Sequence, residues 1–160
     1  MDKALISRRF AKAVGTYLDK ADVQRYVASR MAELTGRYIP SDIQERVLEI
    51  GCGTGMFPRM YLQQAAPEEM WLNDLCPEVE PYLADVLGEK VHFMAKDAET
   101  LAFPEWQDLI VSCSAVQWFE DLPRFFSGCR KLLHEGGYLA FSTFGPHNTE
   151  EVATLTAAGL

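Results

Sequence analysis

The sequence predicts an α/β fold in which helices cover both faces of a parallel β-sheet. Apolar segments of strand length alternate with segments of helical periodicity from about residue 46 onwards. Several of these strand segments are apolar throughout, which is typical of strands covered on both faces. A glycine-rich turn follows the first strand directly, and sheets of this kind bind ligands at the carboxyl ends of their strands.

Residues 1–40 are predicted to form an N-terminal helical cap of two helices. The second helix is expected to begin at Asp22 as N-cap and to end at Gly36. Residues 41–160 are predicted to form the ligand-binding domain. The apolar residues at helical spacing in the cap are Ile6, Phe10, Val14, Tyr17 and Leu18, then Val23, Tyr26, Val27, Met31 and Leu34.

The second domain is expected to alternate strands and helices to its end. A helix beginning at Leu122 has the clearest apolar face and is predicted to stop at Gly136-Gly137. A last helix is predicted from Asn148, where Glu151 completes a capping box. The expected strands are 46–50, 69–73, 90–95, 108–112 and 138–143, and the other expected helices are 55–65 and 80–87.

The composition is that of an ordinary globular domain. The chain has 160 residues, of which 48% are hydrophobic and 24% are charged. It has no apolar run of the roughly 20 residues that a membrane span needs and no signal-peptide core, so we predict a cytoplasmic protein without membrane attachment. Four cysteines without a C-x-x-C pair and three scattered histidines predict neither a metal site nor disulfides.

Charge is unevenly distributed. The chain carries a formal net charge of −8, yet residues 1–40 hold eight Lys and Arg against four Asp and Glu. The acidic remainder argues against nucleic-acid binding, which needs a basic surface. The basic N-terminal section is expected either to attract an acidic partner or to be an ordinary solvated helix face.

The turn after the first strand is the most informative segment. Glycines at 51, 53 and 55 leave bare backbone against which a ligand can lie. The turn lacks the third glycine of the dinucleotide pattern G-x-G-x-x-G, and Glu49 would repel a phosphate. An acid at this place suits a ligand with an ammonium or sulfonium centre. The segment reads Arg46-Val47-Leu48-Glu49-Ile50-Gly51-Cys52-Gly53-Thr54-Gly55.

Asp74 is the second acid expected to bind the ligand. It ends the second strand about 20 residues beyond the glycine turn, a position from which an acid accepts hydrogen bonds from ribose hydroxyls. The alternative is a structural role at the start of the turn before Cys76-Pro77.

The motif E-x-G-x-G-x-G resembles the S-adenosylmethionine site of class I methyltransferases, which have a Rossmann-like fold. The resemblance implies that Asp97, after the third strand, meets the adenine amine; a helical N-cap is its alternative. It also implies that the segment after the fourth strand packs on the methionine part of the cofactor. The implied cofactor-binding residues are Tyr17, Glu49, Gly51, Cys52, Gly53, Gly55, Asp74, Leu75, Asp97, Ala98 and Ser114.

A narrower resemblance is carried by the N-terminus and by the stretch after the fourth strand. The pattern from Ile6 to Gln24, the stretch Ala115-Val116-Gln117-Trp118 and the stretch 141–146 resemble the malonyl-acyl-carrier-protein O-methyltransferases of biotin synthesis. One departure is Ser114, where relatives often carry asparagine. Family members are also about a hundred residues longer, so we expect the last strands to be missing and the fifth strand to be an apolar edge open to homo-oligomerisation.

The resemblance implies methyl transfer from the sulfonium to a free carboxylate, which is ionised near neutral pH and needs no general base. The acceptor is expected to be malonyl-acyl carrier protein or a small-molecule carboxylate. Tyr17 and Trp118 are candidates for positioning groups, and Arg9, Gln117 and Trp118 for substrate contacts. The alternatives are another small-molecule O- or C-methyltransferase, a nicotinamide or flavin enzyme, and a non-catalytic cofactor-binding module.

Overall fold

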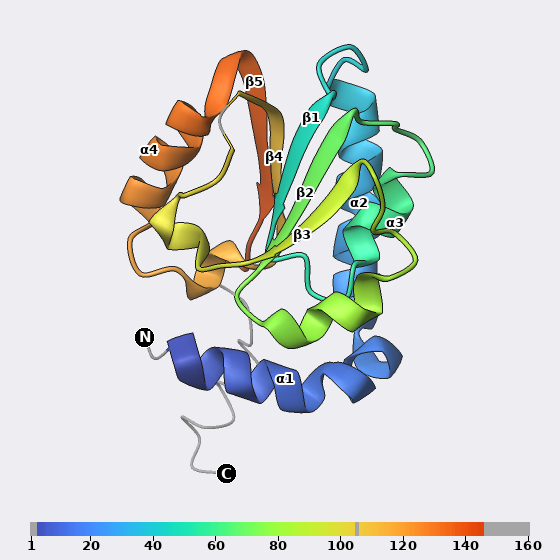
Figure 1. Cartoon of the computed structure of the whole chain (residues 1–160), viewed down its shortest axis with the longest axis vertical. Coiled ribbons are helices and arrows are strands. Elements are labelled where there is room, and N and C mark those ends of the chain that lie inside the picture. The colour runs from blue at the N-terminus through green and yellow to red at the C-terminus, as the bar shows by residue number, and fades with distance from the viewer. Residues whose placement is uncertain (1–2, 105, 146–160) are drawn as a thin grey trace.

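The predicted parallel α/β sheet is confirmed. The computed structural model describes residues 3–104 and 106–145, and in the first helix it describes only the backbone at residues 6, 13, 14 and 16–20. Five strands form one sheet in the order β3-β2-β1-β4-β5, and every neighbouring pair is parallel (Figure 1). The strands are β1 (Arg46–Ile50), β2 (Glu69–Asp74), β3 (Val91–Ala95), β4 (Gln107–Cys113) and β5 (Leu133–Ser142).

The strand order changes direction beside β1. The chain runs outwards from β1 through β2 to β3, then returns to β4 on the other side of β1 and continues to β5. Glu49 in β1 is paired with Leu72 of β2 and Val111 of β4, so it lies at the centre of the sheet near its carboxyl end. In open α/β sheets the crevice at such a change of order is where ligands bind.

Alternate residues of the central strands enter two separate cores, one on each face. Val47 of β1 packs with α2 (Asp22–Tyr38), α3 (Met56–Tyr61) and η1, a 3-10 segment over Pro77–Leu83. On the opposite face Leu48 packs against α4 (Leu122–Leu132). Figure 1 shows α2 and α3 on one side of the sheet and α4 on the other.

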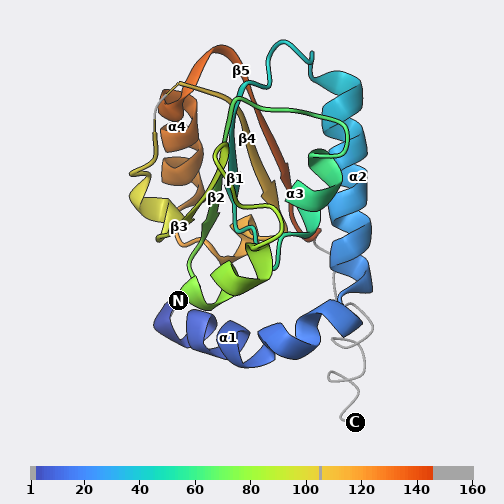
Figure 2. The same ribbon diagram turned by 45° about the vertical axis from the view of Figure 1, so that its right-hand side comes forward.

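The first helix, α1 (Lys3–Lys20), lies across the end of the sheet rather than on either face (Figures 1 and 2). That end carries the carboxyl termini of the strands and two short 3-10 turns, η2 (Ala98–Thr100) and η3 (Val116–Trp118). Within the described residues no helix is both long and apolar enough to cross a membrane.

The bounds of the second helix differ from the prediction. Its N-cap is Ala21 rather than Asp22, which is the first helical residue. The helix also continues through Gly36 to Tyr38, and it ends where Ile39 adopts an extended conformation with ψ of 122°. Ile39 precedes Pro40, and a residue before proline is disfavoured in the helical region, so Pro40 explains this end better than the glycine does.

Two further predicted helices are shorter or of another type. The helix expected over 55–65 is helical only from Met56 to Tyr61. The helix expected over 80–87 is instead the 3-10 segment Pro77–Leu83. Pro77 and Pro81 lack the N–H groups that successive α-helical turns need, which favours the tighter, shorter form.

The predicted helix stop at Gly136-Gly137 is wrong. α4 ends at Leu132, and β5 begins at once with Leu133 in an extended conformation. Both glycines lie in β5, where its register with β4 shifts between Gln107 and Leu109. A Cβ atom on Gly137 would come within 3.0 Å of the carbonyl oxygen of Gln107, so this glycine permits close strand approach instead.

β5 is an outer strand of the sheet, as expected. Tyr138 and Phe141 on it are exposed, and they line a groove against α2. Pairing of this edge with a second chain stays a prediction. The predicted helix from Asn148 falls outside the described residues.

Candidate functional site

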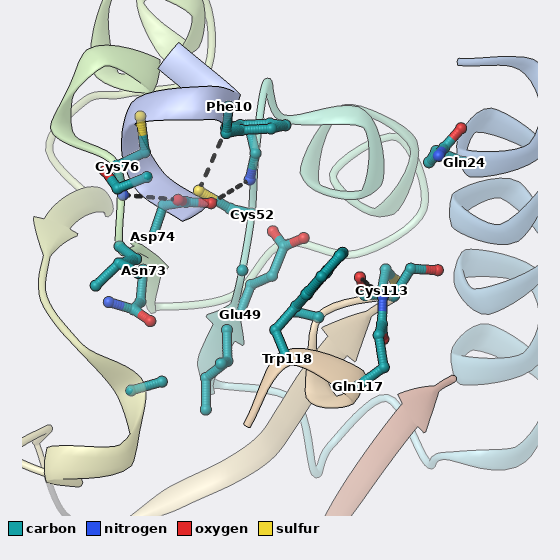
Figure 3. Close-up of a pocket in the computed structure, with 18 of the residues that line it drawn as sticks. Phe10, Gln24, Glu49, Cys52, Asn73, Asp74, Cys76, Cys113, Gln117 and Trp118 are labelled. Carbon is teal, nitrogen blue, oxygen red and sulfur yellow. Dashed lines mark hydrogen bonds between the residues drawn. The ribbon is translucent and has the colours of Figure 1, made fainter. Parts of the chain in front are cut away.

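A cavity of about 530 Å³ opens at the carboxyl end of the sheet, under α1. Its volume is in the range of small-molecule binding sites. The walls come from the turn after β1, the end of β2, residues 96–98, residues 113–119, and the two N-terminal helices. Figure 3 shows Glu49, Asp74, Gln117 and Trp118 arranged around this space, with Phe10 and Gln24 contributed by the helices.

The turn after β1 owes its shape to three glycines in left-handed conformations. The φ angles are 74° at Gly51, 52° at Gly53 and 82° at Gly55. The main-chain N–H groups of Gly51 and Cys52 both donate to the carbonyl oxygen of Asn73 at 2.9 Å. The turn is therefore attached to the end of β2.

The three glycines make room for different neighbours. A Cβ atom on Gly51 would lie 2.4 Å from the Cβ atom of Ala115, which packs on the turn. On Gly53 it would meet only the ring of Phe10, at 3.8 Å, because this residue faces the cavity. Gly53 is therefore the glycine whose bare backbone gives space to a ligand, while Gly55 is not among the cavity-lining residues.

Asp74 joins the glycine turn to the end of β2. Its Oδ2 accepts the N–H of Gly53 at 2.8 Å, and its Oδ1 accepts the N–H of Cys76 at 2.9 Å. The side chain thus has the structural turn role given as its alternative, and it also lines the cavity. Burial raises the pKa of Asp74, although hydrogen bonds from main-chain N–H groups act against this shift.

Glu49 is a buried acid in the wall of the cavity. Its exposed fraction is 1%, and Oε2 has no hydrogen-bond partner. Burial raises the pKa of Glu49 well above its usual value, and the nearby charge of Asp74 raises it further. A buried oxygen without a partner is costly, so the cavity favours a ligand that donates hydrogen bonds or carries positive charge there.

Asp97 has both of its oxygens engaged. Oδ1 accepts the N–H of Glu99 at 3.0 Å, which makes Asp97 the N-cap of η2, the alternative given for it. Oδ2 accepts Nζ of Lys3 at 2.8 Å, and Lys3 also pairs with Glu99. The amino end of α1 is therefore fixed by an ion pair to the part of the cavity where the adenine is expected.

The segment after β4 turns sharply at Ser114, which has φ of 55°. The N–H of Ser114 donates to the carbonyl oxygen and to the hydroxyl of Ser142 at the end of β5. Gln117 donates from Nε2 back to the carbonyl of Ser114, leaving its buried Oε1 without a partner. Trp118 is half exposed at the rim.

The structure brings most of the predicted site residues to one cavity. Of the two exceptions, Gly55 ends the turn but does not line the cavity, and the side chain of Tyr17 is outside the part of the chain that the structure describes. The predicted residues that line the cavity are Arg9, Glu49, Gly51, Cys52, Gly53, Asp74, Leu75, Asp97, Ala98, Ser114, Gln117 and Trp118.

Sequence reasoning assigned Arg9 and Tyr17 of the first helix to the site, but it missed two other residues of that helix. Phe10 and Lys3 line the cavity, and their helical spacing alone gave no indication of which face would point inwards. Three thiols, Cys52, Cys76 and Cys113, also line it. Burial raises the pKa of each, to about 11 for Cys76, so these thiols are neutral and act as small packing groups.

Comparison with known proteins identifies the family. The family described as "Methyltransferase domain" matches residues 48–141, more than half of the chain. The chain belongs to this methyltransferase family. The match begins within β1 and ends within β5, so it includes the glycine turn and the whole of β2, β3 and β4.

The curated relatives that the chain resembles have a more specific name than the family does. The chain is 50% identical over 161 residues to the Bacteroides thetaiotaomicron protein named malonyl-[acyl-carrier protein] O-methyltransferase, covering 100% of this chain and 61% of that protein. The protein of the same name from Acinetobacter baylyi is 35% identical over 160 residues, covering 100% of this chain and 62% of that protein. The chain thus spans about three fifths of the length of these relatives.

A solved structure supports the fold. A SAM-dependent methyltransferase from Leishmania major superimposes with a TM-score of 0.72, at 21% identity, covering 87% of this chain and 59% of that one. The fold is therefore the Rossmann-like fold of class I methyltransferases. In the described residues there is no group of three or more His, Cys, Asp or Glu that could hold a metal ion.

Proposed function

We propose that the cavity binds S-adenosylmethionine and that the protein transfers its methyl group to a carboxylate. The observation that carries the proposal is the buried, unpartnered oxygen of Glu49 beside a glycine turn that leaves Gly53 bare. A phosphate-bearing cofactor would bring negative charge to Glu49 and Asp74, whereas a sulfonium and an ammonium group bring positive charge. Membership of the methyltransferase family agrees with this choice.

In this arrangement the adenosine would lie between Asp74 and Asp97. A ribose hydroxyl would donate to a free lone pair of Asp74, whose oxygens already accept two main-chain N–H groups. The adenine would lie beside Ala98. The cofactor's ammonium group would donate to the orphaned oxygens of Glu49 and Gln117.

Methyl transfer to a carboxylate requires little acid–base catalysis by the protein. The nucleophile is already ionised near neutral pH, so the work is to align the carboxylate oxygen, methyl carbon and sulfur and to exclude water. Trp118 and Phe10 both line the cavity, and in this proposal they would enclose the methyl group. Tyr17 remains a candidate for the methionine end, and the division of the chain at residue 40 into cap and binding domain remains a prediction.

We infer that the acceptor is the malonyl group of an acyl carrier protein. The name of the relative at 50% identity supports this acceptor, and so does an exposed basic stretch on α1. Arg8, Arg9 and Lys12 are all exposed, and Arg9 also lines the cavity. A basic surface at the cavity rim would steer an acidic carrier protein towards the methyl donor. A small-molecule carboxylate is the alternative acceptor.

The decisive assay incubates the full-length protein with radiolabelled S-adenosylmethionine and a panel of acceptors. We expect methyl ester on malonyl-acyl carrier protein and little on free malonate or on quinone precursors. Efficient methylation of a free small acid would favour the alternative. Calorimetry of this chain with S-adenosylhomocysteine and with NAD tests the cofactor itself, and tight binding of NAD alone would contradict the proposal.

A further inference from the structure

Arg59 of α3 reaches back to the glycine turn. Its Nη1 donates to the carbonyl oxygens of Thr54 and Gly55, the second at 2.9 Å. α3 is short, and its N-cap is Gly55, which offers no capping side chain. The turn therefore depends on a side chain from within the helix for contacts on this side.

The same guanidinium also binds the end of η1 and the residues directly after it. Nε donates to Oδ2 of Asp85 at 2.7 Å, Nη2 donates to Oδ1 of Asp85 at 2.6 Å, and Nη2 also donates to the carbonyl of Tyr82. All five N–H groups of the guanidinium thus have acceptors. The paired contact with Asp85 is the bidentate geometry that fixes an arginine in one orientation.

The glycine turn is held from two sides. On one side Asn73 and Asp74 of β2 accept its N–H groups. On the other side Arg59 donates to its carbonyls. The surroundings of Gly55 are consistent with contacts on two sides of the turn. A Cβ atom on Gly55 would lie 3.0 Å from Nη1 of Arg59 and 2.7 Å from the side chain of Leu83. The third glycine makes room for Arg59 rather than for a ligand.

We propose that Arg59 is a positioning residue of the cofactor site, which acts by holding the glycine turn against residues 82–85. Arg59, Tyr82 and Asp85 are not among the residues that line the cavity, so the effect passes through the turn. The part of this inference that concerns affinity rests on the proposed function. Asp85 acts only through Arg59, whose hydrogen bond keeps the pKa of Asp85 below its usual value.

The test compares Arg59→Gln, Asp85→Asn and the double variant with the wild-type chain. Two quantities are measured: the dissociation constant of S-adenosylhomocysteine, and hydrogen exchange of the Gly55 amide, which donates to the carbonyl of Cys52. Arg59→Gln should weaken binding roughly tenfold and speed exchange at Gly55 by about as much, while exchange in β1 and β4 is unchanged. Asp85→Asn should have a smaller effect, and the double variant should equal Arg59→Gln alone.

Arg46→Gln is the matched control. Arg46 also forms an ion pair, with Glu69 at 2.9 Å, but it begins β1 at the end of the sheet away from the cavity. The Arg46→Gln variant should leave both the affinity for S-adenosylhomocysteine and the exchange of the Gly55 amide unchanged. Arg59→Lys should restore little, because an ammonium group cannot bridge the two segments as the planar guanidinium does.

The inference is overturned if Gly55 exchanges at the wild-type rate in Arg59→Gln. If Arg59→Gln does not fold, the Asp85→Asn variant provides the test, because Asp85 is exposed. Wild-type exchange at Gly55 together with wild-type affinity in Asp85→Asn would also overturn the inference. Exchange needs no ligand. A wild-type chain that fails to bind S-adenosylhomocysteine would therefore contradict the proposed function, while the exchange comparison would still test Arg59.

Discussion

Oδ2 of Asp74, the last residue of β2, accepts the main-chain N–H of Gly53, in the turn after β1, at 2.8 Å. The acid at the end of β2 therefore shapes the turn after β1 as well as lining the cavity beside it. A ribose bound there would share a carboxylate that is already oriented by the protein. Binding and turn structure are coupled through this one side chain.

Asp74→Ala is expected to weaken S-adenosylhomocysteine binding by about 1–3 kcal/mol, because it leaves the Gly53 N–H and the ribose without an acceptor. Asp74→Asn keeps one acceptor oxygen and should lose less. Isothermal calorimetry measures both. Undiminished affinity in Asp74→Ala would mean that the ribose binds elsewhere.

Gly53→Ala should reduce cofactor affinity more than a matched glycine substitution does. The new methyl group would project into the cavity, and a left-handed φ also costs a non-glycine residue about 1 kcal/mol. Gly136→Ala is the control, because Gly136 has φ of 87° with nothing within 4 Å of its Cβ position. The two variants should lose similar unfolding free energy, and only Gly53→Ala should lose binding. Equal affinities would show that the ligand does not lie on Gly53.

Glu49→Gln should change how stability depends on pH. Burial raises the pKa of Glu49 in the folded state, so the folded chain holds a proton that the unfolded chain has lost. The unfolding free energy of the wild type should fall as pH rises from the unfolded pKa of about 4.3 through the raised folded value. Glu49→Gln removes this contribution, while Asp74 remains in both proteins. Urea unfolding across this pH range should show that the unfolding free energy of Glu49→Gln increases relative to that of the wild type as pH rises. A difference between the two proteins that stays the same at every pH would contradict this prediction.

The same variant should bind the cofactor more weakly. A glutamine cannot provide the negative charge that a sulfonium or ammonium group induces on Glu49 as it enters. For the wild type, affinity should rise with pH as the carboxyl group ionises, and this slope should be absent in Glu49→Gln. Calorimetry at several pH values measures the two slopes, and a shared slope would assign the titration to another group such as Asp74.

Lys3→Met should speed dissociation of S-adenosylhomocysteine, because Lys3 fixes α1 over the cavity through Asp97 and Glu99. The side chains of Lys3 and Asp97 are 25% and 33% exposed, so an effect of about two- to fivefold is expected. Lys12→Met, on the same helix, is the control. Stopped-flow displacement measures the rate, and identical rates for the two variants would show that the ion pair does not restrain α1.

Arg8→Glu should slow association with an acyl carrier protein and reduce its dependence on salt. The charge lies on the exposed surface of α1, so its effect is long-range steering that salt screens. The association rates of wild type and variant should differ at low ionic strength and become similar at high ionic strength. A wild-type rate that does not respond to salt would contradict steering by this surface.

The sequence predicted the strands closely because each is a short apolar run with turn residues at its ends. The strand expected over 46–50 is β1 itself, and the others shift by one residue at most at either end, except β5, which begins earlier. The local sequence pattern was less reliable where the role of a residue depends on contacts with residues distant in the sequence. Gly137 appeared to end a helix, yet its role depends on the carbonyl of Gln107 in the neighbouring strand.

The site was predicted where its chemistry is local and missed where it depends on the packing of helices. Glu49, Gly53 and Asp74 follow from their places at strand ends. The contact of Lys3 with Asp97 joins residues 94 positions apart, and no periodicity in α1 indicates it. Arg59 gave no signal because three of its hydrogen bonds go to carbonyl groups, which every residue carries, and its carboxylate partner Asp85 is 26 positions away in the sequence.

In the proposed function, the adenosyl part of the cofactor lies on the bare backbone at Gly53, with Glu49 and Asp74 beside it. A crystal structure of the chain with S-adenosylhomocysteine would show whether the ligand lies there. We expect density under α1, at the carboxyl ends of β1 and β2, with the ribose on Asp74. Density in the groove between α2 and β5, or anywhere outside the cavity, would contradict this expectation.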